Sequence, residues 1–108
     1  MKIDILYFDG CPTWRQAAED VQRVLRDARM EGAVQVQLVA IATEEEARRL
    51  RFLGSPTVRV NGSDVDPAVR NATTFGLQCR LYKYRGRLEA SPPTDWIRAA
   101  LGTESTAE

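Results

Sequence analysis

Hydrophobic and polar positions predict alternating strands and helices in the first part of the chain. Residues 2–8, KIDILYF, favour β-structure and carry apolar side chains on both faces, which is typical of a strand inside a sheet. From Trp14 onward apolar residues recur at three- and four-residue spacing, so a long amphipathic helix follows, and Gly32 is expected to stop it. Residues 34–41, VQVQLVAI, predict a second strand that enters the sheet interior.

The next segment predicts a second helix and a third strand. Thr43 and Glu46 have the spacing of a capping box, which begins this helix. Its apolar positions extend to Leu53, and Gly54 is expected to end it. Residues 57–60 alternate as a strand and run into an Asn-Gly turn.

The last part of the chain predicts a connection, a fourth strand and a short helix. Residues 63–78 show no clear period and are expected to form an irregular connection. Residues 79–84, CRLYKY, alternate again as a strand. A proline-containing stretch then precedes a short amphipathic helix that Gly102 closes. Residues 103–108 are polar and are expected to be a flexible tail.

The order of elements defines the expected fold class. Two strands joined by a helix are parallel with a right-handed crossover, and the closely joined last two strands are antiparallel. The order βαβαββα therefore predicts an α/β fold with a mixed four-stranded sheet flanked by helices on both faces. A chain of 108 residues is long enough for one such domain, expected over residues 1–102.

Composition narrows the partners and the chemistry. The 15 basic and 15 acidic residues balance, so the charge provides no argument for nucleic acid or for an anionic membrane surface. The sequence has no apolar run long enough to span a bilayer and no signal-peptide pattern, so a cytoplasmic location is expected. Histidine is absent, which excludes Cys-His dyads, Ser-His-Asp triads and the commonest mixed zinc sites.

The two cysteines are the main candidates for chemistry. Cys11 lies where the first strand gives way to the first helix, so helix amides and the helix dipole would stabilise its thiolate and lower its pKa. A nucleophilic role is favoured over that of a small buried residue at a strand end. Cys79 has three interpretations: a resolving cysteine for Cys11, a second thiolate for a soft metal, or an inert core thiol. Reduced thiols are expected in the cytoplasm.

Other polar and aromatic residues near these cysteines have simpler interpretations. Trp14 has the spacing of a core residue rather than of a substrate platform. Asp9 precedes a glycine and suits a turn better than a proton acceptor. Asp64 and Asp66 are expected to cap a loop. The basic residues of the predicted fourth strand and its turn are expected to form a solvated face: Arg80, Lys83, Arg85 and Arg87.

The order of elements, a cysteine at the start of the first helix and a Ser-Pro-Thr before the third strand together resemble the thioredoxin superfamily over nearly the whole chain. This resemblance implies a cis Ser55-Pro56 peptide bond whose loop faces Cys11. The segments YFDGCPTW, FLGSPTVRVNGSDVDP and LQCRLY are similar to small bacterial thioredoxin-like proteins that are loosely grouped with the alkylmercury lyases. Trp14 stands where a CxxC motif has its second cysteine.

The resemblance implies a thiol-disulfide oxidoreductase without a cofactor. Cys11 would attack a protein or small-molecule disulfide, and glutathione or Cys79 would resolve the intermediate. Cys79 would reach Cys11 only if residues 63–78 fold back over the site. Residues expected to contact the substrate are Pro12, Thr13, Trp14, Ser55, Pro56 and Thr57. Two alternatives stay open: a protein that binds organomercurials or a thiophilic metal ion, and a non-catalytic binding module.

Overall fold

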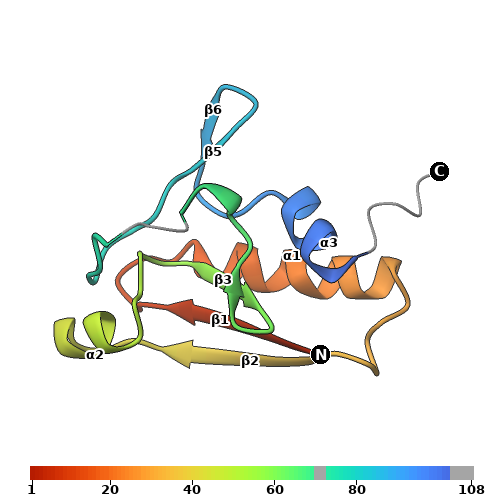
Figure 1. Ribbon diagram of the computed structural model, residues 1–108, viewed down its shortest axis with the longest axis horizontal. Coiled ribbons are helices and arrows are strands. Elements are labelled where there is room, and N and C mark those ends of the chain that lie inside the picture. Colours follow the sequence, from red (N-terminus) through yellow and green to blue (C-terminus); the bar gives the residue numbers. More distant parts are fainter. Residues whose placement is uncertain (70–72, 103–108) are drawn as a thin grey trace.

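Four strands of the computed structural model form one mixed sheet, in the order β2-β1-β3-β4 (Figure 1). The structure describes residues 1–69 and 73–102. The elements along the chain are β1 (Lys2–Tyr7), α1 (Trp14–Asp27), β2 (Gln35–Ala40), α2 (Glu44–Arg49), β3 (Thr57–Val60), β4 (Ser63–Asp64), a 3-10 turn (Pro67–Val69), β5 (Tyr82–Tyr84), β6 (Arg87–Glu89) and α3 (Thr94–Leu101). The predicted α/β class with a mixed four-stranded sheet is confirmed. The predicted tail, residues 103–108, lies outside the described residues.

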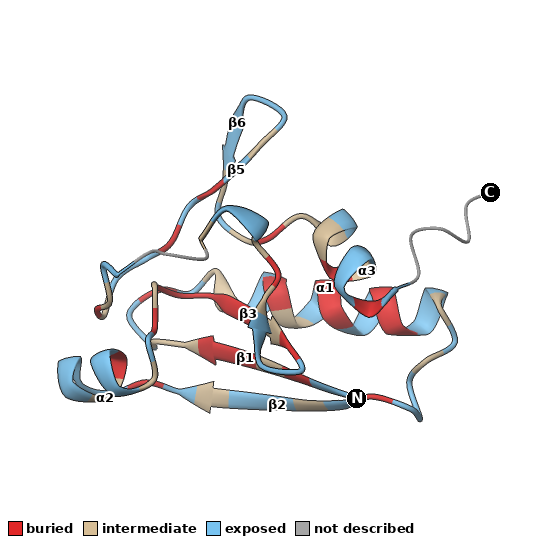
Figure 2. Ribbon diagram, in the orientation of Figure 1, coloured by how far each residue is buried: buried red, intermediate tan, exposed pale blue. Residues whose placement is uncertain are grey.

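β1 is a central strand of the sheet. It pairs in parallel with β2, where Ile5 lies opposite Leu38, and antiparallel with β3, where Ile5 lies opposite Val58. Alternate residues of β1 and β3 point to the same side of the sheet and are buried there against α1 and α3 (Figure 2). The fully buried members of this main core include Ile3, Ile5, Val21, Val24, Val58 and Ile97.

The opposite side of the sheet is covered only near one end. Leu6 points to this side and packs with Ala47 of α2, and Phe52 completes a second, smaller cluster. Arg59 of β3 donates hydrogen bonds to the carbonyls of Leu50 (2.8 Å) and Arg51 (2.9 Å), so β3 is tied to the end of α2. Helices therefore lie on both sides of the sheet, as expected, but α2 spans only part of its side (Figure 1).

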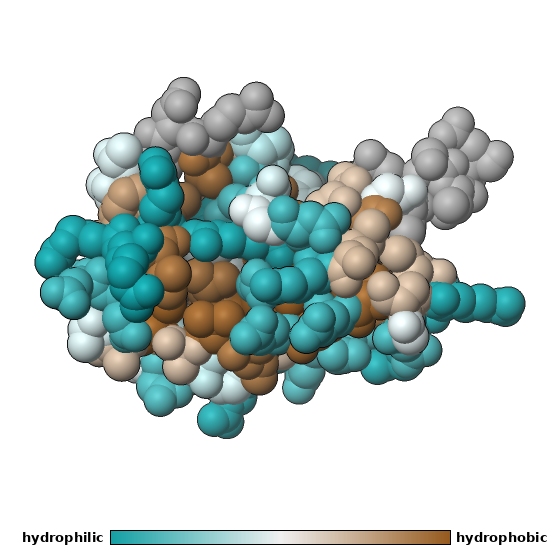
Figure 3. All heavy atoms as spheres, turned by 60° about the horizontal axis from the view of Figure 1, so that its bottom comes forward, coloured by the Kyte–Doolittle hydropathy of each residue, from teal (hydrophilic) through white to brown (hydrophobic). Residues whose placement is uncertain are grey.

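The prediction that the second strand enters the sheet interior is wrong. β2 is an edge strand, and its residues are exposed or half-buried. Leu38 is 49% exposed, and apolar surface lies among hydrophilic side chains on this side of the molecule (Figure 3). The apolar residues that flank the strand, Val34 and Ile41, are buried instead. A periodic pattern cannot distinguish an edge strand from a central one, because the pattern does not say whether a neighbouring strand exists.

In two helices the left-handed residue just beyond the helix end is an arginine, and not the glycine expected from the sequence. Arg29 has a φ of 56°, and the next amide, that of Met30, donates to the carbonyl of Leu25 at 2.9 Å. The same arrangement ends α2, where Arg51 has a φ of 56° and Phe52 donates to Ala47 at 2.7 Å. Both are Schellman caps, which satisfy the last carbonyls of a helix. Neither Gly32 nor Gly54 ends its helix, whereas Gly102 caps α3 as predicted.

The fourth strand of the main sheet is β4, and not the predicted strand at residues 79–84. Asn61 and Gly62 both have positive φ, so their tight turn returns the chain at once beside β3. Ser63 and Asp64 then fill the position next to β3. Only Tyr82–Tyr84 form a strand in the later segment, and this strand, β5, pairs with β6 in a separate hairpin that projects from the body (Figure 1).

Within residues 1–69 and 73–102, the helices are too short or too polar to cross a membrane.

Candidate functional site

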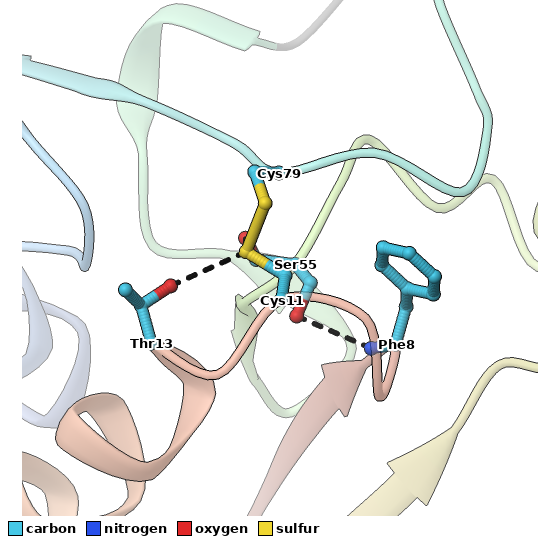
Figure 4. Close-up of a disulfide and its surroundings, with 5 residues drawn as sticks. All are labelled: Phe8, Cys11, Thr13, Ser55 and Cys79. Atoms are coloured by element: carbon cyan, nitrogen blue, oxygen red, sulfur yellow. Dashed lines mark hydrogen bonds between the residues drawn. A yellow bond between two sulfur atoms is a disulfide. The ribbon is translucent and has the colours of Figure 1, made fainter.

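Cys11 and Cys79 form a disulfide where three segments meet (Figure 4). The segments are the turn after β1, the loop before β3, and the extended chain that leads to β5. The two α-carbons are 5.7 Å apart, within the usual range of 4.4–6.8 Å for disulfides. The sequence left open whether the two cysteines pair, and the structure shows that they do. The reduced thiols expected from the sequence are therefore not present in this structure. The remaining interpretation of Cys79, an inert core thiol, is wrong, because Cys79 is exposed.

Cys79 is held in place by a backbone bridge rather than by a strand of the sheet. The amide of Ser55 donates to the carbonyl of Gln78 at 2.8 Å, and the amide of Arg80 donates to the carbonyl of Ser55 at 2.9 Å. These two bonds form an isolated parallel bridge between Ser55 and Cys79. The connection thus folds back over the site, which is the condition that the sequence set for contact between the two cysteines.

Gly54 makes this close approach possible. It has a φ of 125°, which only glycine adopts readily. A Cβ at this position would lie 2.9 Å from the Cβ of Arg80 and 3.1 Å from the carbonyl oxygen of Gln78. Gly54 was expected to end a helix. In the structure it instead allows the loop before β3 to approach the backbone of Gln78 and Arg80.

The Ser-Pro-Thr loop forms one wall of the site. The Ser55-Pro56 peptide bond is cis, as the resemblance implies. The Ser55 hydroxyl accepts a hydrogen bond from the amide of Phe8 at 3.2 Å, and the Thr57 hydroxyl donates to the carbonyl of Gly54 at 2.6 Å. The carbonyl of Pro56 accepts from the hydroxyl of Tyr82. Ser55, Pro56 and Thr57 are buried, so their side chains hold the loop rather than face solvent.

Cys11 is the buried half of the disulfide. Its residue is 3% exposed, and its amide donates to the carbonyl of Phe8 at 3.0 Å. Thr13 occupies the N-cap position of α1 but makes no capping bond. Its hydroxyl lies 3.4 Å from the sulfur of Cys11 instead (Figure 4). A disulfide sulfur carries no proton, so the hydroxyl is the donor in this contact.

The residues that follow Cys11 lie at the surface. Pro12 is exposed, and Thr13 and Trp14 are half-buried. Trp14 stacks on Tyr7 with ring centroids 4.2 Å apart, and the guanidinium of Arg15 lies 5.2 Å from its ring. Trp14 belongs to neither core cluster, so the prediction of core packing is wrong for this residue. It forms an aromatic pair beside the buried cysteine.

Arg80, next to Cys79, is the functional residue that the sequence interpretation missed. It is only 7% exposed, and its guanidinium makes bonds of 2.7 and 3.1 Å to the two carboxylate oxygens of Asp64. A further bond of 3.1 Å reaches the hydroxyl of Thr57, and Asp66 lies 3.6 Å away. The expected solvated face is therefore wrong for Arg80. The alternation of residues 79–84 already places Arg80 on the same side as Tyr82, which is buried.

The two aspartates act as predicted and also pair with Arg80. Asp64 accepts from the amide of Asp66 at 2.9 Å, and Asp66 accepts from the amide of Ala68 at 2.9 Å, so both cap the loop. Burial is the largest single effect on the pKa of Arg80 and lowers it, but the hydrogen bond with Asp64 and the negative charges of Asp64 and Asp66 act together with Tyr82 to leave the pKa raised. The ion pair fastens the segment behind Cys79 to β4.

Tyr82 is the buried aromatic residue of the site. Its side chain is fully buried, with the guanidinium carbon of Arg80 4.4 Å from the ring centroid. Burial raises the pKa of Tyr82 well above its ordinary value, and the nearby positive charge of Arg80 offsets only part of this rise. The phenol therefore stays protonated and continues to donate to Pro56.

Comparison of the chain with protein-family models, curated proteins and solved structures finds no match. The thioredoxin resemblance stays a prediction. Among the described residues, no group of three or more His, Cys, Asp or Glu side chains is placed to hold a metal ion. A thiophilic ion at this site would be bound by the two cysteine sulfurs only after reduction of the disulfide. The arrangement itself, a disulfide between an exposed and a buried cysteine, is suited to exchange with an external thiol.

The first prediction concerns the close approach at Gly54. The substitution Gly54→Ala forces a Cβ against Arg80 and a positive φ on alanine, so it is expected to lower the free energy of unfolding by about 3 kcal/mol. Gly62→Ala is the matched control, because Gly62 also has positive φ but open space around its Cβ. It is expected to cost about 1 kcal/mol. Urea unfolding of the oxidised proteins measures both; equal losses would contradict the close-approach argument.

The second prediction concerns Tyr82. Its folded-state pKa is raised above the unfolded value of about 10, so its contribution to stability is full below pH 10 and is lost as pH rises beyond it. Tyr82→Phe is expected to cost about 1–2 kcal/mol at neutral pH, because the Pro56 carbonyl loses its donor. The difference in unfolding free energy from wild type should shrink above pH 10, by up to about 1.4 kcal/mol per pH unit. If the difference in unfolding free energy between wild type and Tyr82→Phe stayed constant with pH, the raised pKa of Tyr82 would be contradicted.

Proposed function

We propose that this protein is a thiol-disulfide oxidoreductase whose redox pair is Cys11 and Cys79. The observation that carries the proposal is the bond between an exposed cysteine and a buried one from distant parts of the chain. In the cytoplasm expected from the sequence, stable disulfides are rare, and those that form are usually catalytic or redox-sensing. The partner is a protein or small molecule with thiols or a disulfide.

The exposure of the two residues indicates the direction of the exchange. A thiolate of the partner attacks the sulfur of Cys79, the bond between Cys79 and Cys11 breaks, and its electron pair leaves on Cys11. A second thiolate of the partner then attacks the partner's first sulfur, which is bonded to Cys79 in the mixed disulfide. The partner's own disulfide forms, and Cys79 is released as a thiolate. Two electrons and two protons pass from the partner dithiol, which becomes a disulfide, to the two cysteines of this protein.

This direction reverses the roles expected from the sequence, where Cys11 is the nucleophile. Cys11 is the buried sulfur, so a large partner meets Cys79 first. The Thr13 hydroxyl, 3.4 Å from the sulfur of Cys11, can donate to a Cys11 thiolate. The Ser55 carbonyl lies 3.7 Å from the same sulfur and can accept its proton when the thiol forms. A stabilised thiolate is a good leaving group, so the contact with the Thr13 hydroxyl favours cleavage toward Cys11.

The third prediction is a reduction potential typical of exchange-active pairs. Equilibration of the protein in thiol buffers of graded composition, followed by thiol trapping with a heavy maleimide, measures the fraction of oxidised Cys11–Cys79. We expect a midpoint between about −300 and −120 mV, the range of thiol-disulfide oxidoreductases. A midpoint clearly below −300 mV would identify a stabilising cross-link and contradict the proposal. Reduced protein that binds Hg²⁺ stoichiometrically but exchanges no disulfide would favour the thiolate-binding alternative.

The fourth prediction distinguishes the reactivity of Cys79 from that of Cys11. Cys11→Ser leaves only Cys79, and Cys79→Ser leaves only Cys11, and both variants lose the same cross-link. With oxidised glutathione, Cys11→Ser is expected to form a mixed disulfide roughly tenfold faster than Cys79→Ser, because an accessible thiol reacts faster than a buried one. Mass spectrometry of samples quenched at intervals measures the rates. Faster reaction of Cys79→Ser would restore Cys11 as the sulfur that meets the partner.

A further inference from the structure

The chain that runs from Cys79 into β5 has an anchored side and an exposed side. Arg80 and Tyr82 are buried, whereas Cys79, Leu81 and Lys83 alternate with them and are exposed. Leu81 is 61% exposed. Leu88 of β6 lies opposite Lys83 in the hairpin and is 67% exposed. We call Cys79, Leu81, Lys83 and Leu88 the outer face.

The anchored side holds the outer face in a fixed position. Arg80 is paired with Asp64, and Tyr82 donates to the carbonyl of Pro56. The rings of Tyr82 and Tyr84 both lie edge-on to Trp96 of α3, with centroids 6.0 and 5.9 Å apart. The alternate residues of one short segment thus tie it to β3, β4 and α3. A partner would meet a preorganised surface, which lowers the entropy cost of binding.

The hairpin beside the outer face carries more basic than acidic residues, although the chain as a whole is neutral. Lys83, Arg85 and Arg87 are exposed on the hairpin, and Glu89 is its only acidic residue. Arg85 pairs with Asp95 and Arg87 pairs with Glu89, each at 3.8 Å. Both ion pairs are exposed, and exposed ion pairs contribute little to stability. A partner segment with an acidic residue complements this charge.

The backbone beside the disulfide is also available for pairing. The two bonds to Ser55 are made by Gln78 and Arg80, so the amide and carbonyl of Cys79 point to the other side. Among the described residues these two groups of Cys79, and those of Leu81, have no hydrogen-bond partner. Directly opposed residues of an antiparallel pair have α-carbons about 5.5 Å apart, which lies within the range of disulfides. A cysteine that pairs opposite Cys79 is therefore positioned for exchange.

We propose that the outer face binds an extended segment of a protein partner, which adds as an antiparallel strand along Cys79 and Leu81. The segment carries its reactive cysteine opposite Cys79, an apolar residue opposite Leu81, and an acidic residue opposite Lys83. This inference rests on the proposed exchange at Cys79 and names the kind of substrate that the site selects.

A peptide of the pattern Glu-x-Leu-x-Cys tests the inference, with its cysteine activated as a mixed disulfide with thionitrobenzoate. The protein is the full chain with Cys11→Ser, so that only Cys79 reacts. The Cys79 thiolate bonds to the peptide sulfur, and thionitrobenzoate leaves as a coloured thiolate whose release gives the rate. The readout is the ratio of this rate to the rate with a mixed disulfide of mercaptoethanol and thionitrobenzoate, which cannot pair as a strand.

The ratio is expected to fall roughly fivefold with Leu81→Ser, as one apolar contact is lost. Leu38→Ser removes an exposed leucine on β2 and is the matched control, for which the ratio should not change. Lys83→Glu should lower the ratio with the acidic peptide and raise it with a peptide that has lysine in place of glutamate. Methylation of the peptide amides that would pair with Cys79 should also lower the ratio.

Three outcomes would overturn the inference or its basis. A ratio that none of the protein or peptide changes affects would show that the outer face does not select the partner, although exchange at Cys79 would stand. A lack of reaction even with the small disulfide would instead contradict the proposed function. A wild-type dimer in sedimentation that Leu81→Ser converts to a monomer would show that a second copy of this chain covers the outer face.

Discussion

The bridge between Ser55 and the chain on either side of Cys79 is the contact on which the site depends. Two backbone hydrogen bonds hold Cys79 beside Ser55, although the two residues are far apart in sequence. In this position the sulfur of Cys79 is within bonding distance of the sulfur of Cys11. Gly54 permits the approach because any larger residue would meet Arg80 and Gln78. Without the bridge, Cys79 would be one more residue of a long connection, and Cys11 would have no second sulfur near it.

Burial and charge then give the two sides of the site different properties. The Arg80–Asp64 pair and the Tyr82 hydroxyl fix the segment behind Cys79 to the body of the protein, while the side chains that alternate with them stay in solvent. Cys11 lies on the other side, shielded and next to the Thr13 hydroxyl. One disulfide therefore joins an exposed cysteine to a buried one, and this difference gives the proposed exchange a direction.

Local patterns predicted the elements well where each element needs only its own residues. The strand at β1, the amphipathic α1 and the turn at Asn61-Gly62 follow from hydrophobic period and turn chemistry, and all are present. The helix ends were less predictable, because Arg29 and Arg51 adopt a positive φ, a conformation that is usually expected of glycine. The fourth strand was placed wrongly for a related reason: a two-residue strand such as β4 is too short to leave a periodic signal.

The sequence by itself determined the α/β class, the position of Cys11 between the first strand and the first helix, and the absence of histidine, since these depend on residue types and local spacing. Only the tertiary structure decided that Cys79 reaches Cys11, that Arg80 is buried, and which of the two cysteines is exposed. The physical reason is that pairing and burial are set by segments distant in sequence. The path of the chain after β4, which brings Cys79 to Ser55, has no periodic pattern from which it could be inferred.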